Sequence, residues 1–154
     1  MPESIHNQNK KFIGRLRAAL YDINPSTLKS QLGELFAPDC DIKLAFPFEN
    51  LDGPAELYER AYVPLIEAIP DLDYVGFTAF PGLQLTFSGD GFLGIPPNDR
   101  EFTMRSLDFW RCENGFIREN WVIVDLLDFY NQMGVDVFER MREMTVARRT
   151  IPIR

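Results

Sequence analysis

The stretch that decides the fold is Met104-Arg-Ser-Leu-Asp-Phe-Trp-Arg-Cys-Glu-Asn-Gly-Phe-Ile-Arg-Glu-Asn-Trp-Val-Ile-Val-Asp125. Two runs rich in aromatic and β-branched residues flank Asn114-Gly115, and both residues of this dipeptide tolerate a positive φ. The stretch therefore predicts a β-hairpin. Its second strand ends on the carboxylate of Asp125, and burying a carboxylate is costly unless the group is protonated or paired.

Outward from the hairpin, the chain predicts helices first and antiparallel strands afterwards. Helices are predicted over residues 5–21, 25–36 and 55–69, and strands over 40–45, 72–80, 83–88, 102–111 and 116–124. A last helical region, 125–144, is broken at Gly134. This order is typical of an α+β fold rather than of βαβ units. With 154 residues and no linker, residues 1–154 are expected to form a single domain.

Composition and charge limit the classes of partner. A net charge of −7 disfavours nucleic acid or an anionic membrane as the main partner. Thirteen phenylalanines are enough to wall a large apolar interior or pocket. The chain shows neither a signal peptide nor an apolar run long enough to span a bilayer, so a cytoplasmic protein is expected.

No metal and no cofactor are predicted. His6 is the only histidine, and it lies in the first turns of a polar N-terminal helix. No other histidine is present to build a histidine-based metal site or a Ser-His-Asp triad. Gly89-Asp-Gly-Phe-Leu-Gly94 has the glycine spacing of a dinucleotide site. Such a site needs a helix after the glycines, whereas Pro96-Pro97 and a strand follow here.

Asp125 has two interpretations of comparable weight. In the first, it caps the helix that starts at Leu126, which is a structural role. In the second, it is a general acid/base in an apolar pocket, where desolvation raises its pKa. By period-two alternation Trp121, Ile123 and Asp125 share one face of their strand, and Asn120 is expected on the outer side.

The turn decides which residues of the preceding strand join that face. A two-residue turn predicts the set Met104, Ser106, Asp108 and Trp110. A three-residue loop with a bulge predicts Thr103, Arg105, Leu107 and Phe109 instead. The first register is preferred because it points Arg111 and Arg118 outward together. The first register places two acids, Asp108 and Asp125, on one face, whereas the second places the cation of Arg105 near Asp125.

Several segments, in order from roughly residue 35 to residue 135, resemble one known family. They are Phe46-Pro-Phe with Gly53; Tyr62-Val-Pro-Leu followed by Ile69-Pro-Asp-Leu72; Gly91-x-x-Gly94-Ile-Pro-Pro; and Arg111-x-x-x-Gly-x-Ile-x-Glu-x-Trp121-x-x-x-Asp125 followed by Gln132-Met-Gly134. The set is similar to the SnoaL-like polyketide cyclases, also called ester cyclases, of the nuclear transport factor two-like superfamily.

That resemblance implies a cone-shaped, curved antiparallel sheet closed by N-terminal helices, as in an α+β barrel, with a deep apolar pocket and a homodimer formed through the outer sheet face. Characterised members close the last ring of an aromatic polyketide ester by an aldol reaction without metal or cofactor. Asp125 falls on the family's catalytic acid/base, with Asp108 or Arg105 as an auxiliary group. The expected pocket residues are Trp121, Trp110, Tyr62, Phe46, Phe48, Ile123 and Met104.

Three functions follow as hypotheses. The first is a cofactor-independent cyclase or isomerase that acts on a small apolar carbonyl compound or polyketide ester by acid/base chemistry. The second is a non-catalytic module that binds an apolar ligand in the same pocket. The third and weakest is epoxide hydrolysis by a set made of Arg105, Asp108 and Asp125, which needs a bulge to bring them to one face.

Overall fold

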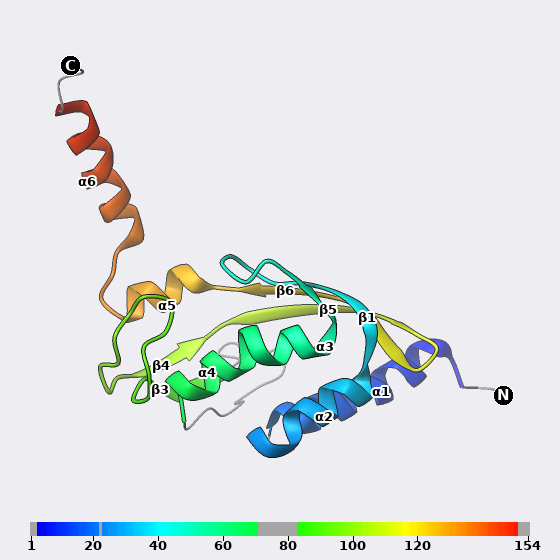
Figure 1. Cartoon of the computed structure of the whole chain (residues 1–154). Helices are drawn as coiled ribbons and strands as arrows, with labels where there is room; N and C mark the ends of the chain where they lie inside the picture. Colours follow the sequence, from blue (N-terminus) through cyan, green and yellow to red (C-terminus); the bar gives the residue numbers. More distant parts are fainter. Residues whose placement is uncertain (1–2, 22, 71–82, 151–154) are drawn as a thin grey trace.

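The computed structural model describes residues 3–21, 23–70 and 83–150, and it confirms the α+β class. Helices α1 to α4 lie against one face of a curved sheet, and the last helix, α6, projects from the other end of the molecule (Figure 1). The strand predicted over residues 72–80 lies outside the described residues. No helix in the described part is long and apolar enough to cross a membrane.

The first two helices match the predictions from apolar spacing. Helix α1 spans Ile5–Tyr21 and α2 spans Pro25–Leu35. The side chain of Asn24 accepts a hydrogen bond from the Ser26 amide at 3.0 Å, and proline occupies the first turn, as expected for a capped helix start. The leucines of α2 at positions 28, 32 and 35 are buried, so its apolar stripe faces the sheet.

The third predicted helix forms as three joined segments. These are α3 (Gly53–Glu56), a π-helical turn η1 (Leu57–Tyr62) and α4 (Val63–Ala68). The Val63 amide donates to the Tyr58 carbonyl, five residues earlier. Pro64 follows directly, and a proline has no amide hydrogen for the regular helical bond, which accounts for the change of pitch at this point.

The main sheet has the strand order β2-β1-β6-β5. Its strands are β1 (Phe36–Lys43), β2 (Asn50–Asp52), β5 (Ser106–Glu113) and β6 (Phe116–Val124). Strand β1 runs parallel to β6, so the prediction of a wholly antiparallel sheet was wrong for this pair. Parallel pairing needs a long crossover, and the helices after β2 belong to it.

A second, antiparallel pair is formed by β3 (Leu83–Thr86) and β4 (Glu101–Met104). The chain leaves the strand pattern at Arg105, so the single predicted strand over residues 102–111 divides into β4 and β5. Within the described residues the two sheets remain separate and do not close into a barrel.

The hairpin has the predicted two-residue turn. Asn114 and Gly115 have φ values of 52° and 79°, and Glu113 lies opposite Phe116. Cys112 lies opposite Ile117, but Arg111 lies opposite Glu119, which leaves Arg118 as an extra residue in β6. This bulge shifts every later pair by one position.

The preferred register was therefore wrong although the turn was right. Phe109 lies opposite Trp121 and Leu107 lies opposite Ile123, as in the alternative register. Trp121 and Ile123 of β6 therefore lie on the outer face, where they are 49% and 61% exposed. The guanidinium of the bulged Arg118 pairs at 2.6 Å with Asp39 of β1, a contact between strands that local sequence does not reveal.

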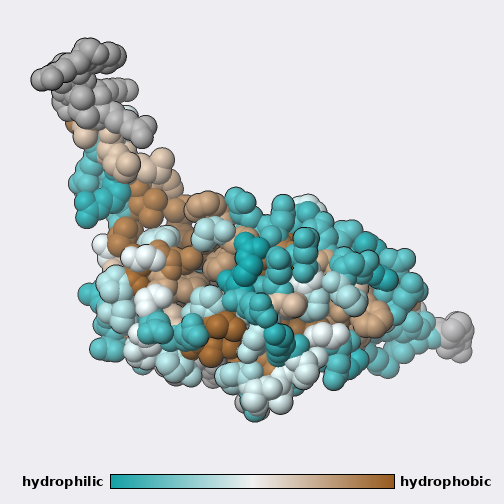
Figure 2. Space-filling model, in the orientation of Figure 1, coloured by the Kyte–Doolittle hydropathy of each residue, from teal (hydrophilic) through white to brown (hydrophobic). Residues whose placement is uncertain are grey.

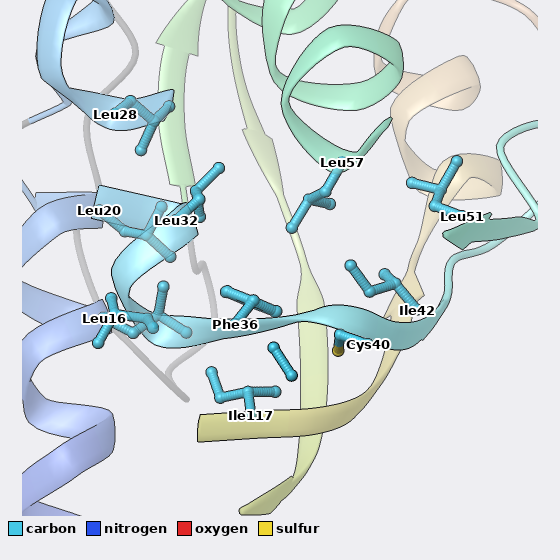
Figure 3. Close-up of a cluster of buried hydrophobic side chains, with 12 residues drawn as sticks. Leu16, Leu20, Leu28, Leu32, Phe36, Cys40, Ile42, Leu51, Leu57 and Ile117 are labelled. Atoms are coloured by element: carbon cyan, nitrogen blue, oxygen red, sulfur yellow. The ribbon is translucent and has the colours of Figure 1, made fainter. Parts of the chain in front are cut away.

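The core consists of two clusters. Figure 3 shows the first, in which α1, α2, β1 and η1 pack around Phe36 and Leu32 with Ile117 of β6. The second gathers Phe87, Phe92, Phe102 and Phe129 at the other end, with the rings of Phe102 and Phe129 at 5.2 Å between centroids. Burial of these side chains supplies most of the driving force for folding.

The C-terminal region forms α5 (Leu126–Gln132) and α6 (Val137–Thr150), separated at the predicted break. Gly134 has a φ of +82°, a conformation that glycine adopts without strain. The carboxylate of Asp136 accepts a hydrogen bond from the Glu139 amide at 2.8 Å and so caps α6. Helix α6 then leads away from the body of the protein (Figure 1).

Candidate functional site: an interior cavity with one carboxyl group

An interior cavity of about 130 Å³ lies between the inner face of β5 and β6 and the helices α1 and η1. Five of the residues predicted for a site line it: Asp108, Trp110, Tyr62, Phe48 and Met104. Most of the remaining lining residues are aliphatic or aromatic, and they include Leu16, Leu57, Val122 and Val124. The cavity is therefore an apolar space with a few polar groups, which is the usual composition of a small-molecule site.

Asp108 is the one acidic residue among the described residues that line this cavity. Burial raises the pKa of its carboxyl from 3.8 to about 6, and a hydrogen bond from Asn120, which favours the carboxylate, opposes part of that rise. A carboxyl with this pKa is present in both protonation states near neutral pH. It can therefore accept a proton and return it.

Asn120 is the buried amide next to this acid, with only 3% of its surface exposed. Its Nδ2 lies 3.4 Å from Asp108 Oδ1 and 3.3 Å from the Phe109 carbonyl oxygen. With the amide oxygen and nitrogen exchanged, the oxygen accepts from Trp110 Nε1 at 3.0 Å and from the Trp121 amide at 3.2 Å. The prediction that Asn120 faces outward was wrong.

The physical reason is that both faces of β6 are apolar. Val122 and Val124 occupy the cavity side, whereas Trp121 and Ile123 occupy the exposed side. Alternation separates two such sets but does not tell which one is buried. The signal that would have helped is the single amide in the inner set, because a polar residue among buried ones must find partners.

Asp125 lies at the end of β6 as the N-cap of α5. One of its carboxylate oxygens accepts from the Asp128 amide at 3.0 Å, and the other pairs with Arg105 at 2.7 Å. Arg105 also contacts the Asp128 carboxylate at 3.0 Å. About 41% of the Asp125 side chain is exposed. The structure thus shows the capping role that was one of its two interpretations, and the catalytic role stays a prediction.

A second hollow of about 900 Å³ opens on the outer side of the sheet, between β5, β6, α5 and the loop at Phe46-Pro47. Four predicted site residues line this outer groove: Arg105, Asp125, Phe46 and Ile123. Trp121 lies farther along the same face, with the Lys43 ammonium 5.4 Å from its ring. The groove shares lining residues with the interior cavity: Ala45, Ser106, Leu107, Val124 and Leu126.

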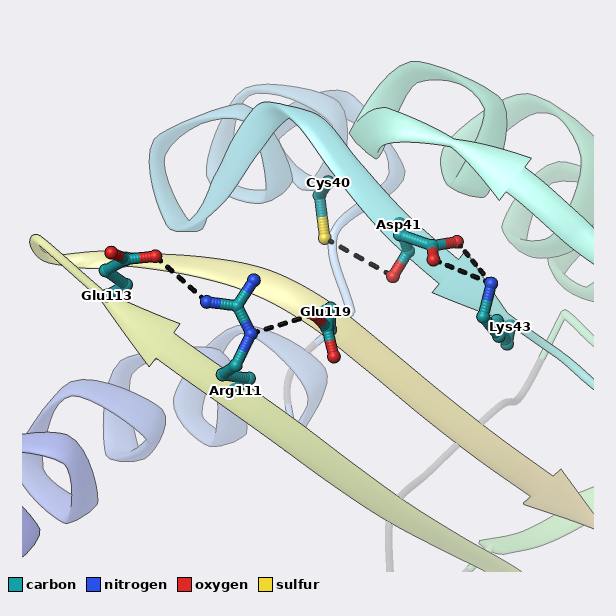
Figure 4. Close-up of polar contacts among 6 residues, drawn as sticks. All are labelled: Cys40, Asp41, Lys43, Arg111, Glu113 and Glu119. Atoms are coloured by element: carbon teal, nitrogen blue, oxygen red, sulfur yellow. Dashed lines mark hydrogen bonds and ion pairs between the residues drawn. The ribbon is translucent and has the colours of Figure 1, made fainter.

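The set proposed for epoxide hydrolysis is divided between the two hollows. Asp108 lines the cavity, whereas Arg105 and Asp125 line the outer groove. Farther along the outer face, Arg111 bridges Glu113 and Glu119, and Lys43 pairs with Asp41 (Figure 4). These are exposed ion pairs, which contribute little to stability. Within the described residues, no three metal-ligating side chains come together.

Comparisons with known proteins agree with this architecture. The model of the family described as SnoaL-like polyketide cyclase matches residues 14–133. No protein of curated function matches the sequence. The structure is similar to IdmH of Streptomyces antibioticus, described as a candidate polyketide cyclase, with 26% identity, a TM-score of 0.61 and coverage of 83% of this chain and 99% of that one.

Two more distant structures share the fold. A candidate SnoaL-like polyketide cyclase from Jannaschia sp. CCS1 is 20% identical, with a TM-score of 0.66 over 88% of this chain and 98% of that one. An NTF2-like protein from Burkholderia thailandensis E264 is 17% identical, with a TM-score of 0.56 over 80% of this chain and 95% of that one.

Proposed function

This chain belongs to the SnoaL-like polyketide cyclase family, and we propose that it is an acid/base enzyme that acts on a small apolar carbonyl compound in its interior cavity. The observation that carries the proposal is a single carboxyl, Asp108, whose pKa is raised to about 6 in an otherwise mainly apolar cavity. No cofactor is required for this chemistry.

In the proposed reaction, the Asp108 carboxylate removes a proton from a carbon next to a carbonyl group. The electron pair of that C–H bond moves onto the carbonyl oxygen and forms an enolate. In a cyclase, the enolate carbon then attacks a second carbonyl of the same molecule, and the resulting alkoxide takes the proton back from Asp108. In an isomerase, the proton returns to a different carbon.

The neighbours of Asp108 fit this role. The buried amide nitrogen of Asn120 lies 3.4 Å from the Asp108 carboxylate, and the side chain of Trp110 lines the same cavity. An amide N–H is a donor of the kind that stabilises an enolate oxygen in a site with little water. A cavity of about 130 Å³ is close to the roughly 150 Å³ that holds one benzene molecule, so one ring of the substrate fits inside. A larger polyketide ester would extend toward the adjoining groove.

Hydrogen–deuterium exchange at carbon tests the proposal without knowledge of the natural substrate. Small cyclic β-keto esters are incubated with the protein in D₂O, and loss of the α-proton is followed by NMR. We expect the wild type to accelerate exchange and Asp108→Asn to lose about 10²-fold or more of that acceleration. Equal exchange rates for Asp108→Asn and the wild type would refute the role of Asp108.

Asp125→Asn is the matched variant in this assay, because it removes the other predicted catalytic carboxyl. If Asp108 is the acid/base, Asp125→Asn keeps most of the exchange activity. If the activity follows Asp125 instead, the family-based assignment of the catalytic acid is correct and Asp108 is not the base.

A binding module remains the second candidate, and the mainly apolar cavity wall favours it. A module of this kind would bind apolar ring compounds with the same affinity in the wild type and in Asp108→Asn. It would accelerate no exchange at all.

A further inference from the structure

We propose that α6 of one copy of this chain docks on the outer face of a second copy, and that the exchange is reciprocal. The family resemblance predicts a homodimer through the outer sheet face, but it does not involve α6. The structure adds two apolar surfaces on the same chain, one on α6 and one on the sheet, and it leaves both exposed.

The first surface is a stripe along α6. Phe138, Met141 and Met144 are 58%, 59% and 59% exposed. At 100° per residue, these three side chains and Val137 lie within about one third of the helix circumference. An isolated helix of this length is marginally stable in water, and tertiary packing of its apolar face normally stabilises it. The stripe therefore needs a partner surface.

The second surface, the outer-face patch, consists of apolar side chains that are 46–75% exposed. They are Phe46, Leu107, Phe109, Trp121, Ile123 and Leu127. Figure 2 shows hydrophobic surface gathered at the base of α6 and on the adjoining part of the body. Contiguous apolar patches rimmed by polar residues mark interaction sites. The ion pairs of Arg111 and Lys43 supply the polar rim.

The area of the two surfaces is sufficient for a stable dimer. Nine large apolar side chains, each about half exposed, offer on the order of 100 Å² each, or about 900 Å² per copy. Two copies would bury roughly 1,800 Å², which lies within the range of roughly 1,200–2,000 Å² found for specific interfaces.

Charge favours the same pairing. Helix α6 holds four arginines and two glutamates, a net charge of +2, while the whole chain carries −7. The remainder of the chain therefore carries −9. A cationic helix is attracted to the anionic body of another copy, and this attraction also offsets repulsion between the two bodies.

The occupant is a second copy because α6 leads away from its own patch. Val137 lies at the edge of the groove, and the following turns extend outward (Figure 1). A two-fold axis brings the stripe of each copy to the patch of the other. Since the groove shares residues with the interior cavity, the partner helix would wall the space next to Asp108. Only this last point rests on the proposed function.

Three glutamate variants of the full chain, one of them a control, test the docking. Met141→Glu charges the stripe, and Val146→Glu places the same residue on the opposite side of α6 at a similarly exposed position, 59% against 62%. Trp121→Glu charges the patch. Molar mass is measured by light scattering and sedimentation over a range of concentrations, and circular dichroism checks that each variant is folded.

We expect a wild-type dimer, a dissociation constant raised by about 100-fold or more in Met141→Glu and in Trp121→Glu, and an unchanged constant in Val146→Glu. A monomeric wild type would overturn the inference. So would a dimer that Met141→Glu and Val146→Glu affect equally, or one that only Trp121→Glu dissociates, since the sheet would then pair without α6. None of these outcomes depends on catalysis.

Discussion

The substitution Asp108→Asn tests how the buried carboxyl affects the stability of the fold at different pH values. The pKa of Asp108 is about 6 in the folded protein against an ordinary 3.8, so the folded state binds this proton more tightly than the unfolded state. The resulting contribution to the free energy of unfolding is fully present below pH 3.8 and is lost as the pH rises through about 6. A difference of about 2 pKa units corresponds to about 3 kcal/mol.

Asparagine at position 108 is neutral at every pH, so the free energy of unfolding of the variant does not decrease through ionisation at this position. At pH 4.5 about 2 kcal/mol of the wild-type contribution remains, and at pH 8 none does. The free energy of unfolding of Asp108→Asn, taken relative to the wild type, should therefore rise by about 2 kcal/mol between pH 4.5 and pH 8. All other carboxyl groups are common to both proteins, so their titration cancels in this difference.

The assay is urea unfolding followed by circular dichroism at pH 4.5, 6 and 8. Asp90→Asn serves as the control, since Asp90 is exposed and the substitution removes the same charge. A difference between Asp108→Asn and wild type that stays constant across this range would refute the argument. It would mean that the carboxyl is solvated in the folded protein.

Substitutions at three other positions address individual side chains. Asp125→Ala removes the cap of α5 and an ion pair, so it should lower the free energy of unfolding by about 1–2 kcal/mol in urea titrations, and Asp125→Asn, which keeps a capping oxygen, should cost less. Asn120→Ala removes a hydrogen bond that lowers the pKa of Asp108, so carboxyl NMR should find that pKa above its wild-type value. Gly89→Ala would press its Cβ into the backbone of α4, so thermal melting should show a loss of roughly 2 kcal/mol or more.

Local chemistry predicted much of this fold. The hairpin turn, the capped start of α2 and the break after α5 each depend on residues next to one another in the chain, such as Asn114-Gly115 or Asn24-Pro25. These dipeptides restrict the backbone wherever they occur. The strand β6 also formed over the predicted residues 116–124.

The register and the site depended on contacts that are distant in sequence. The bulge at Arg118 is accompanied by an ion pair with Asp39, 79 residues earlier in the chain. It sets the later hairpin pairs, so Asp108 and Asn120 face the cavity while Trp121 faces outward. Because β6 is apolar on both faces, alternation alone gave no means to choose between them. The family motif contains Asp125, whereas the acidic residue that lines the cavity is Asp108.

The most direct test of the central claim is the pKa of the Asp108 carboxyl, measured by ¹³C NMR with Asp108→Asn to assign the signal. The structure predicts a value of about 6, because burial in the cavity disfavours the carboxylate. A value at or below the ordinary 3.8 would show a solvated carboxylate, and it would contradict the proposal that Asp108 exchanges protons with a substrate in the cavity.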